Sequence, residues 1–261
     1  MDRPAIFITG AAAGIGRATA ELFASRGWFL GLYDLDETGL RILRDRFGED
    51  NCIIGRLDTT DVAAYSAALA AFWERTGHRL DVLFNNAGIA NVGDFEQIPL
   101  AQHHRLIDVN LKGVVNGCHL ALPYLLKTPD ARVISMCSAS AIYGAPSLSM
   151  YSSTKFAVRG LTESLNVEWD RHGIRVMDIM PLFVNTPMVR QFENQPQSAK
   201  ALGVRLTAED IARVVWKAAT RPLWATPVHW YPGLQTLLMH VLTKISPSFV
   251  NRFVVKKLSG S

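Results

Sequence analysis

The sequence is poor in cysteine, and its few cysteines are not arranged for a metal site or a disulfide framework. Only three occur in 261 residues, Cys52, Cys118 and Cys137, with no Cys-x-x-Cys pair or Cys/His cluster. An odd number of widely spaced cysteines predicts free thiols in a reducing compartment, and we expect a cytoplasmic protein. A chain of this length buries roughly 70–75% of its unfolded surface, so it needs no disulfide or structural metal.

The sequence also lacks segments that would direct or hold a chain in a membrane. No run of 18 apolar residues occurs, although 49% of the residues are hydrophobic. Met1-Asp-Arg-Pro4 leads directly into a strand-like stretch, so we expect neither a signal peptide nor a membrane span. Repeats and low-complexity segments are missing too. The length then favours one domain over residues 1–261.

Acidic residues are missing from the C-terminal fifth of the chain. No Asp or Glu follows Asp210, whereas this segment holds seven cations: Arg213, Lys217, Arg221, Lys244, Arg252, Lys256 and Lys257. The whole chain carries +4, so the first 210 residues carry −3, the difference between +4 and +7. Cations spread so sparsely do not form a nucleic-acid patch, and we expect no nucleic-acid partner.

A strand, a glycine turn and a helix open the chain. Residues 5–8 are apolar, and the residues after them include Thr9, Gly10, Gly14, Ile15 and Gly16. Gly10 permits a sharp turn, and Gly14 and Gly16 allow the backbone to approach a pyrophosphate closely. The unpaired N–H groups and the dipole at the start of the helix favour an anion there. The alternative is a tight turn whose small residues serve packing alone.

An acid ends the second apolar stretch, residues 28–34. Asp34 lies 24 residues after Gly10, near the ~20-residue offset at which a carboxylate holds an adenosine ribose. A 2′-phosphate at about 4 Å from this carboxylate would cost roughly 4 kcal/mol per unit-charge pair. No basic residue follows Asp34, so the sequence favours NAD over NADP, with Arg17 as the counter-evidence. The alternative role for Asp34 is to cap the next helix.

Further strands and helices alternate along the chain. We expect strands near residues 53–57, 80–84, 132–136, 174–180 and 228–231, and helices near residues 61–75, 99–126, 150–171 and 210–220. With the first two strands, this predicts a doubly wound α/β fold, a seven-stranded parallel sheet with helices on both faces. Asp58 either meets an adenine edge or caps the helix that follows it. Asn110 either has a structural role or holds a water, because an unpaired buried amide costs about 1–3 kcal/mol.

Tyr151 and Lys155 are four residues apart and share one face if the segment is helical. Tyrosine is a poor acid at neutral pH, with a reference pKa near ~10, and a nearby ammonium lowers that pKa. Ser138, in the loop after the fifth strand, could hold a substrate oxygen beside the phenol. The three groups together could move a proton on and off an alcohol or carbonyl oxygen. A Tyr-x-x-x-Lys pair by itself also arises often by chance.

Taken together, these elements resemble the short-chain dehydrogenase/reductase family along nearly the whole chain. The matching motifs, in the order and spacing of the family, are Thr9-Gly-x-x-x-Gly-Ile-Gly16, Asn85-Asn-Ala-Gly88, Asn110, Ser138 and Tyr151-x-x-x-Lys155. The resemblance implies a Rossmann-type domain that uses NAD to interconvert a secondary alcohol and a ketone by hydride transfer. An NADP-dependent carbonyl reductase and a catalytically silent NAD-binding sensor or scaffold are the alternatives.

The resemblance also implies roles for individual residues. Tyr151 would be the general acid/base, Lys155 would lower its pKa and bind the nicotinamide ribose, and Ser138 would orient the substrate oxygen. Asn110 would hold a water in a proton relay to Lys155. The implied cofactor contacts beyond the glycine turn and Asp34 are Asp58, Asn86, Ala87, Gly88, Tyr151, Lys155, Pro181, Val184 and Thr186.

The substrate end is expected to be apolar, with candidate pocket residues Ser138, Ser140, Tyr143, Phe183 and Met188. Ser140 rivals Ser138, but the 13-residue step to Tyr151 favours Ser138. Residues 187–206 have no strong period and predict a substrate lid. Leu182 stands where the family usually has glycine, which we expect to alter the geometry near this lid.

Residues 233–261 form an apolar and basic C-terminal extension. Leucine and valine recur there at helical spacing, and Lys256 and Lys257 follow. The pattern predicts a helix that covers the substrate cleft or a subunit interface. The alternative is an amphipathic segment that lies on a membrane or receives a lipid-like substrate. The family resemblance further implies a homodimer or homotetramer assembled through the helices near residues 99–126 and 150–171.

Overall fold

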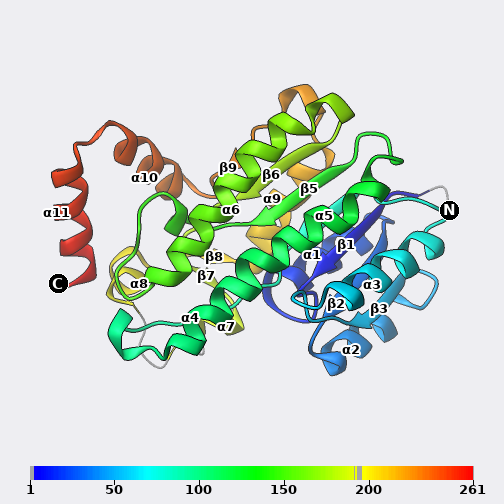
Figure 1. Cartoon of the computed structure of the whole chain (residues 1–261), viewed down its shortest axis with the longest axis horizontal. Coiled ribbons are helices and arrows are strands. Elements are labelled where there is room, and N and C mark those ends of the chain that lie inside the picture. The colour runs from blue at the N-terminus through cyan, green and yellow to red at the C-terminus, as the bar shows by residue number, and fades with distance from the viewer. Residues whose placement is uncertain (1–2, 191, 193–195, 261) are drawn as a thin grey trace.

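Seven parallel strands form the central sheet of the computed structural model, which describes residues 3–190, 192 and 196–260. Their order is β3-β2-β1-β4-β5-β6-β9, with every neighbouring pair parallel. The strands are β1 (Ala5–Thr9), β2 (Phe29–Asp34), β3 (Cys52–Arg56), β4 (Val82–Asn85), β5 (Arg132–Met136), β6 (Arg175–Ile179) and β9 (His229–Trp230). The predicted doubly wound fold is therefore confirmed (Figure 1).

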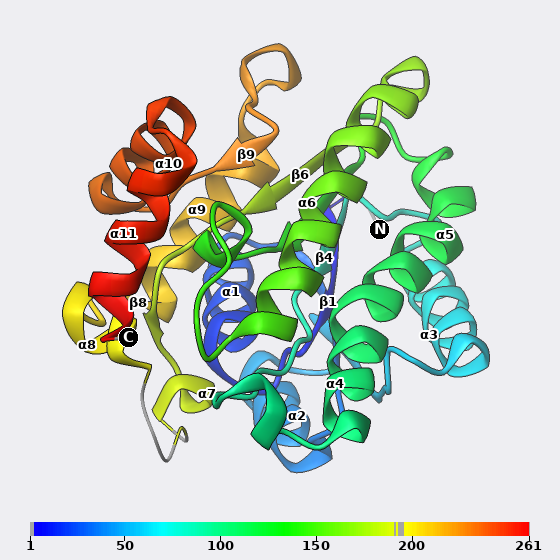
Figure 2. The same cartoon turned by 60° about the vertical axis from the view of Figure 1, so that its left-hand side comes forward.

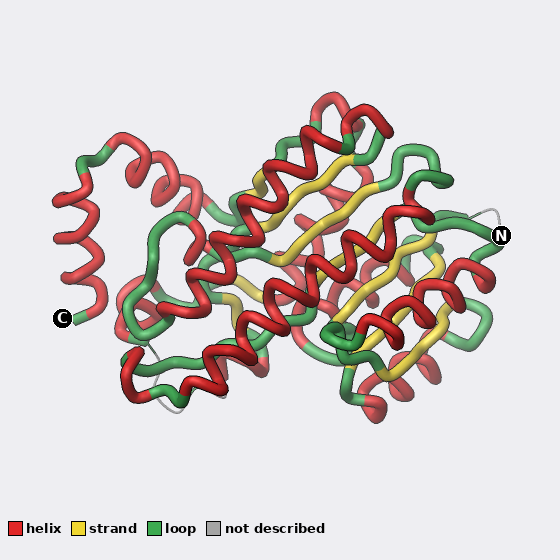
Figure 3. Tube along the Cα trace, in the orientation of Figure 1, coloured by secondary structure: helices red, strands yellow, loops and turns green. Residues whose placement is uncertain are grey.

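Helices cover both faces of the sheet, as Figure 3 shows. Alternate β1 residues enter two separate cores, because successive side chains of a strand point to opposite faces. Ile6 and Ile8 pack under α1 (Gly14–Ala24), α2 (Glu37–Phe47) and α9 (Ala208–Thr220). Ala5 and Phe7 pack under α3 (Val62–Arg75), α5 (Gly113–Leu125) and α6 (Ser149–Glu168). Burial on both faces explains why these strands read as continuous apolar runs.

The long helix expected near residues 99–126 is interrupted. Its first part is α4 (Leu100–Ile107), a π-helical turn occupies Asp108–Lys112, and α5 follows. This wide turn contains Asn110, and the Asn110 side chain makes hydrogen bonds with the backbone of Ile89. A π turn inside a helix frequently marks a functional site.

Two capping alternatives in the sequence are wrong. Asp36, not Asp34, caps α2 by accepting from the backbone N–H groups of Thr38 and Gly39. Asp61, not Asp58, caps α3 by accepting from Ala64. Asp34 and Asp58 are thereby left at the cavity described below.

The predicted lid holds two short helices, α7 (Pro187–Arg190) and α8 (Gln197–Leu202). Its residues 191 and 193–195 lie outside the described residues. Strands β7 (Val184–Asn185) and β8 (Leu206–Thr207) flank the lid and pair with each other in parallel.

The C-terminal extension forms α10 (Leu234–Ile245) and α11 (Ser248–Ser259), and residue 261 lies outside the described part of the chain. These two helices stand out from the sheet at one end of the molecule in Figure 1, and Figure 2 shows α11 beside α8. Within the described ranges, no helix is long and apolar enough to cross a membrane.

The glycine turn after β1 packs where no side chain fits. A Cβ on Gly16 would lie 2.0 Å from the Gly10 carbonyl oxygen and 2.7 Å from Asn86 Nδ2. Gly10 itself has φ +67°, a conformation that suits glycine. This close approach lets the start of α1 lie directly against the end of β4.

We predict that Gly16→Ala lowers the free energy of unfolding by about 1–3 kcal/mol, because the added methyl group overlaps backbone atoms. The matched control is Gly160→Ala in α6, where no atom lies within 4 Å of the added Cβ. That control should raise the free energy of unfolding by about 0.5–1 kcal/mol, since alanine is the better helix former. Urea denaturation followed by tryptophan fluorescence measures both. Equal stability of Gly16→Ala and the wild type would contradict the packing argument.

Candidate active site

A cavity of about 450 Å³ lies beyond the carboxyl ends of the strands, next to the point where the chain order reverses between β1 and β4. In open α/β sheets this reversal creates the crevice in which ligands bind. The glycine turn and Asp34 line one part of the cavity, Tyr151 and Lys155 another, and the lid and α11 close the far part.

The two turns after β1 and β4 are joined by hydrogen bonds. Thr9 Oγ1 accepts from the backbone N–H groups of Asn86 and Ala87, each at 3.1 Å. Asn86 Nδ2 donates to the carbonyl oxygens of Thr9 and Gly10, each at 2.9 Å. These four bonds fix the backbone on both sides of the reversal point and explain the Thr-Gly and Asn-Asn-Ala-Gly motifs.

Asp34 lines the cavity and also ties it to the glycine turn. Its Oδ2 accepts from the Ala12 N–H at 2.9 Å, and its Oδ1 accepts from the Asp36 N–H at 3.1 Å. Arg17, the counter-evidence for NADP, pairs with Glu21 at 3.2 Å and is not among the cavity-lining residues. The hydrogen bonds that Asp34 accepts from described residues thus come from backbone N–H groups and not from a cation.

Asp58 lines the cavity with Arg105, a residue that the sequence did not single out. Asp58 Oδ1 accepts from the backbone N–H and hydroxyl of Thr60, and Asp58 Oδ2 accepts from Arg105 at 3.1 Å. Burial opposes ionisation of Asp58, but the bonds from Thr60 and Arg105 outweigh it and hold its pKa below the usual value. Arg105 lies in α4, 47 positions from Asp58, so no local motif signals it.

Asn110 is fully buried and almost fully hydrogen-bonded. Its Oδ1 accepts from the Ile89 N–H at 2.8 Å, and its Nδ2 donates to the Ile89 carbonyl at 2.9 Å and to Thr154 Oγ1 at 3.3 Å. These bonds tie the π turn to the segment after β4 and to α6. A Cβ on Gly88 would lie 3.2 Å from Asn110 Oδ1 and 3.8 Å from Lys155 Nζ. The backbone at Gly88 therefore lies close to both side chains.

Tyr151 and Lys155 both lie in α6, but Lys155 is engaged elsewhere. Its Nζ donates to the Met136 carbonyl oxygen at 2.8 Å and lies 5.5 Å from the centre of the Tyr151 ring. Burial lowers the pKa of Lys155, and Cys137 partly opposes this effect.

The lowering of the Tyr151 pKa expected from Lys155 does not prevail over burial in this geometry. Burial raises the Tyr151 pKa to about 12, and a hydrogen bond with Ser138 offsets only part of that effect. The phenol therefore keeps its proton at neutral pH.

Ser138 begins the 3₁₀ turn Ala139–Ala141 at the end of β5. Its Oγ accepts from the Ser140 N–H at 3.2 Å, and its hydroxyl is near enough to the Tyr151 phenol to lower the pKa of that phenol by hydrogen bonding. Ser140 lines the same cavity but caps nothing there. The geometry thus puts Ser138, more than its rival Ser140, beside the phenol.

The far part of the cavity is apolar. It is lined by Tyr143, Leu148, Leu182, Phe183, Met188, Val189, Phe192, Leu202, Met239, Val255 and Leu258, with the hydroxyls of Ser138, Ser140, Ser198 and Ser259. Charged side chains among the described lining residues are confined to Asp34, Asp58, Arg105 and Lys155. Tyr143, Phe183 and Met188 were expected here. Helix α8 lies in the predicted lid, and α10 and α11 belong to the extension expected to cover the cleft or a subunit interface, but the sequence did not single out their lining residues.

Leu182 occupies the position where glycine is usual in the family. It packs against the buried cluster that contains Cys137, Ala139, Ala141, Ile142 and Met180, and it does not have a positive φ. The backbone at this position therefore tolerates a side chain. Pro181, Val184 and Thr186, on either side of it, line the cavity as well.

These features fit a dinucleotide. The glycine turn keeps side chains away from the first turn of α1, where a Cβ on Gly14 would meet Thr186 at 3.4 Å. A carboxylate lies at one part of the cavity, and a phenol, an ammonium and a hydroxyl lie at another.

Comparison with known proteins gives the family. The chain belongs to the short chain dehydrogenase family, whose profile matches residues 4–197, and is thus an oxidoreductase with a nicotinamide cofactor. Oxidoreductase UcpA of Salmonella typhimurium is 36% identical over 217 residues, which are 78% of this chain and 82% of that protein. Levodione reductase of Leifsonia aquatica is 32% identical over 214 residues, covering 80% and 79% respectively. A crystal structure of a short chain dehydrogenase/reductase from Burkholderia phymatum in complex with NAD has a TM-score of 0.81 and 27% identity, covering 92% of each chain.

Proposed function

We propose that this protein is an NAD(H)-dependent oxidoreductase that interconverts a secondary alcohol and a ketone on a neutral, apolar substrate. The observation that carries the proposal is that Ser138 and the Tyr151 phenol line the same cavity, whose far part has no charged side chain among the described lining residues. A hydroxyl and a phenol can hold and protonate a carbonyl oxygen, while the apolar wall surrounds the rest of the substrate.

In the proposed mechanism, Ser138 orients the substrate oxygen and Tyr151 gives it a proton during ketone reduction. A phenol whose pKa is about 12 is protonated at neutral pH and is ready for this step. Alcohol oxidation reverses the transfer and needs the phenolate, which the positive charges of Lys155 and of an oxidised nicotinamide ring favour. The cofactor, when bound, supplies or takes the hydride. Asn110 has one acceptor position left for a water that relays the proton toward Lys155.

The apolar wall also limits the substrate class. An ionised carboxylate or phosphate held among these side chains would lack a cation, and burying an unpaired charge is costly. We therefore expect a ketone or alcohol without an anionic group. A levodione reductase is among the similar proteins, which agrees with a carbonyl substrate.

We infer that NAD is the cofactor, with an NADP-dependent carbonyl reductase as the alternative. Asp34 would face the 2′-position of the adenosine ribose, and Arg105, a cation of the described cavity wall, is already paired with Asp58. The complex of the Burkholderia phymatum protein with NAD supports this choice. The silent sensor or scaffold is disfavoured because Ser138, Tyr151 and Lys155 meet at one cavity.

We predict that Tyr151→Phe lowers turnover by at least about 10²-fold, because the acid/base group is lost. Binding of NADH, followed by its fluorescence, should stay close to wild type. Tyr124→Phe, in α5 and away from the cavity, is the matched control and should keep full activity. The wild-type rate of ketone reduction should fall at alkaline pH as the phenol loses its proton. Turnover by Tyr151→Phe at the wild-type rate would refute the mechanism.

We further predict that initial rates are at least about 100-fold higher with NADH than with NADPH at equal low concentrations, because the Asp34 carboxylate repels a 2′-phosphate. The double change Asp34→Ser and Leu35→Arg should reverse much of this preference, since it removes the anion and adds a cation at the same place. Arg17→Ala should leave the preference unchanged. A wild type that prefers NADPH would establish the alternative.

We also propose a cytoplasmic homodimer or homotetramer, assembled through α4–α5 and α6, that touches a membrane surface with α10 and α11. Nine large apolar side chains of these two helices are exposed: Leu234, Leu237, Leu238, Val241, Leu242, Ile245, Phe249, Phe253 and Val254. The same helices carry Lys244, Arg252, Lys256 and Lys257 and no acid.

Two copies of α10 and α11 facing each other would bring together cations without carboxylates. An anionic lipid surface neutralises these cations and accepts the apolar side chains. Val255 and Leu258 of α11 also line the apolar part of the cavity, so an apolar substrate would enter from the side that faces the lipid.

We predict that the wild type co-sediments with vesicles containing phosphatidylglycerol and that Phe249→Ser with Phe253→Ser reduces this binding at least about 10-fold, because apolar anchoring area is lost. Ile42→Ser with Val62→Ser is the matched control, since both residues are exposed and lie in α2 and α3, outside α10, α11 and the helices proposed to form the subunit interface. High salt should weaken the wild-type binding. No vesicle binding, together with dissociation of an oligomer in the phenylalanine variant, would assign this surface to a subunit interface instead.

A further inference from the structure

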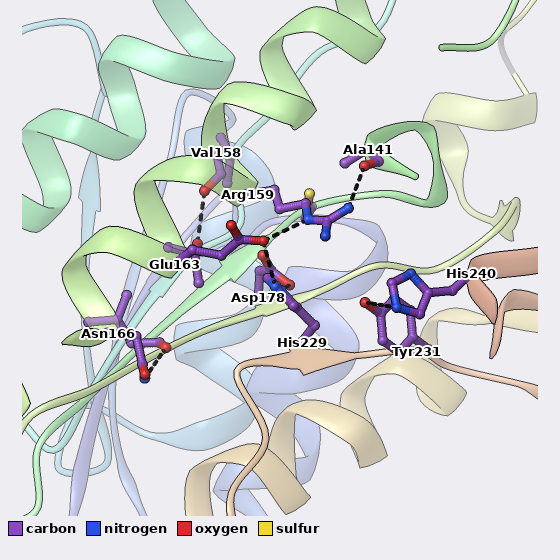
Figure 4. A network of polar contacts seen from close by, with 12 residues as sticks. Ala141, Val158, Arg159, Glu163, Asn166, Asp178, His229, Tyr231 and His240 are labelled. Atoms are coloured by element: carbon purple, nitrogen blue, oxygen red, sulfur yellow. Dashed lines mark hydrogen bonds and ion pairs between the residues drawn. The ribbon is translucent and has the colours of Figure 1, made fainter. Parts of the chain in front are cut away.

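One face of α6 carries a polar residue at every fourth position: Tyr151, Lys155, Arg159 and Glu163. Residues four apart on a helix lie one above the other, so the row that begins at the phenol continues along the helix. The proposed mechanism uses only the first two. Figure 4 shows where the other two lead: Arg159 sits between Ala141 and Glu163, and Glu163 continues to His229 and Asp178.

Arg159 joins this network to the turn that carries Ser138. Its Nη1 donates to the Ala141 carbonyl oxygen at 3.1 Å, and its Nε donates to Glu163 Oε1 at 2.9 Å. The rigid, forked guanidinium makes these bonds from two separate nitrogens, whereas an ammonium would have to reach both acceptors from one nitrogen.

Ala141 is the last residue of the turn that Ser138 begins. The Ala141 N–H donates to the Ser138 carbonyl oxygen at 2.9 Å, and the Ala139 N–H donates to the Pro181 carbonyl oxygen at 2.8 Å. The turn is thus held near its start by Pro181 and at its end by Arg159.

His229 connects two carboxylates in the same network. Its Nε2 bonds Glu163 Oε1 and its Nδ1 bonds Asp178 Oδ1, each at 2.9 Å. Both ring nitrogens can donate only in the imidazolium form. Burial acts against that form, but the two carboxylates outweigh it and raise the pKa of His229. Arg159 is the charged group nearby that opposes the imidazolium.

Protonated His229 balances the charges of the network. Asp178 is fully buried in β6, its Oδ2 has no hydrogen-bond partner among the described residues, and burial raises its pKa. Other titratable side chains beside this network are Cys137, just after β5, Tyr231, just after β9, and His240 of α10; Tyr231 and His240 bond each other at 3.1 Å. Arg159 and imidazolium therefore offset Glu163 and Asp178, and the balance is lost when His229 is neutral.

We propose that Arg159 is a positioning residue that holds the turn at residues 138–141 so that the Ser138 hydroxyl faces Tyr151, with the charge of His229 sustaining this hold through Glu163. The role given to Ser138 rests on the proposed function. The hold on the turn rests on the geometry alone, so it can be measured without a substrate. A merely structural network would fix β9 to the sheet edge and leave the turn unaffected by Arg159.

Amide hydrogen exchange tests the hold directly. Exchange at residues 139–142 should be about 10-fold faster in Arg159→Ala than in the wild type, because the turn opens locally more often. Arg159→Lys should show a similar acceleration, since lysine keeps the charge but lacks the two separate nitrogens that bond Glu163 and Ala141, and this variant serves if Arg159→Ala fails to fold. Arg41→Ala is the matched control, because it removes another helical arginine whose glutamate, Glu37, lies four residues away.

The pH dependence tests the part played by His229. A raised histidine pKa means that the imidazolium contribution is complete below the unfolded pKa and is lost as pH rises through the folded pKa. Exchange at residues 139–142, corrected for its intrinsic pH dependence, should therefore accelerate across that range in the wild type. In His229→Gln it should be fast throughout, without the step.

A double-mutant cycle tests the route from Arg159 to Ser138. Arg159→Ala should lower kcat about 10-fold with little change in KM for NADH, because the cofactor end is not touched. In a Ser138→Ala background the same substitution should change kcat less than about 2-fold, since residues that act through one group are not additive.

The outcomes separate this inference from the proposed function. Wild-type exchange of the turn in both Arg159 variants overturns the inference, and so does a loss of kcat in Arg159→Ala that is fully additive with Ser138→Ala. Full activity of Ser138→Ala and Tyr151→Phe would refute the proposed function. Faster exchange in the Arg159 variants would still establish the hold on the turn.

Discussion

The hydrogen bonds between the ends of β1 and β4 are the constraint on which the rest of the site depends. Buried backbone N–H and C=O groups must find partners where two parallel strands stop. Here the Thr9 hydroxyl and the Asn86 carboxamide satisfy four such groups across the reversal point. This cross-link brings the glycine turn against Asn86 and leaves a crevice beside it. The cavity thus arises where the sheet must stop.

Helix α6 places Tyr151 and Lys155 at the same crevice. Its buried face includes Thr154, which bonds Asn110, and Lys155, which bonds the Met136 carbonyl at the end of β5. Both bonds fix the helix relative to the strand ends and use up polar groups that would otherwise be buried without partners. Lys155 is thereby bonded to a backbone carbonyl, and burial, which Ser138 offsets only in part, raises the pKa of Tyr151.

The C-terminal helices both line the cavity and expose apolar side chains at the protein surface. α11 has no fully buried residue, yet Val255 and Leu258 complete the cavity wall. Helix α11 is therefore apolar both toward the cavity and toward the protein surface. The C-terminal segment thus shapes the apolar part of the cavity, whereas the glycine turn and the Asn-Asn-Ala-Gly motif shape the part near Asp34.

Local sequence patterns determined the doubly wound sheet, the glycine turn and the shared face of Tyr151 and Lys155. Each of these depends on residues within one or two turns or strands, where apolar period and glycine placement carry the information. Only the tertiary structure decided that Asn110 bonds Ile89, that Asp58 pairs with Arg105 and that Arg159 reaches Ala141. It also decided that Asp36 and Asp61 cap the helices, so that Asp34 and Asp58 lie at the cavity. The physical reason is that a side chain's partner is set by where elements distant in sequence pack together, and no local period encodes that distance.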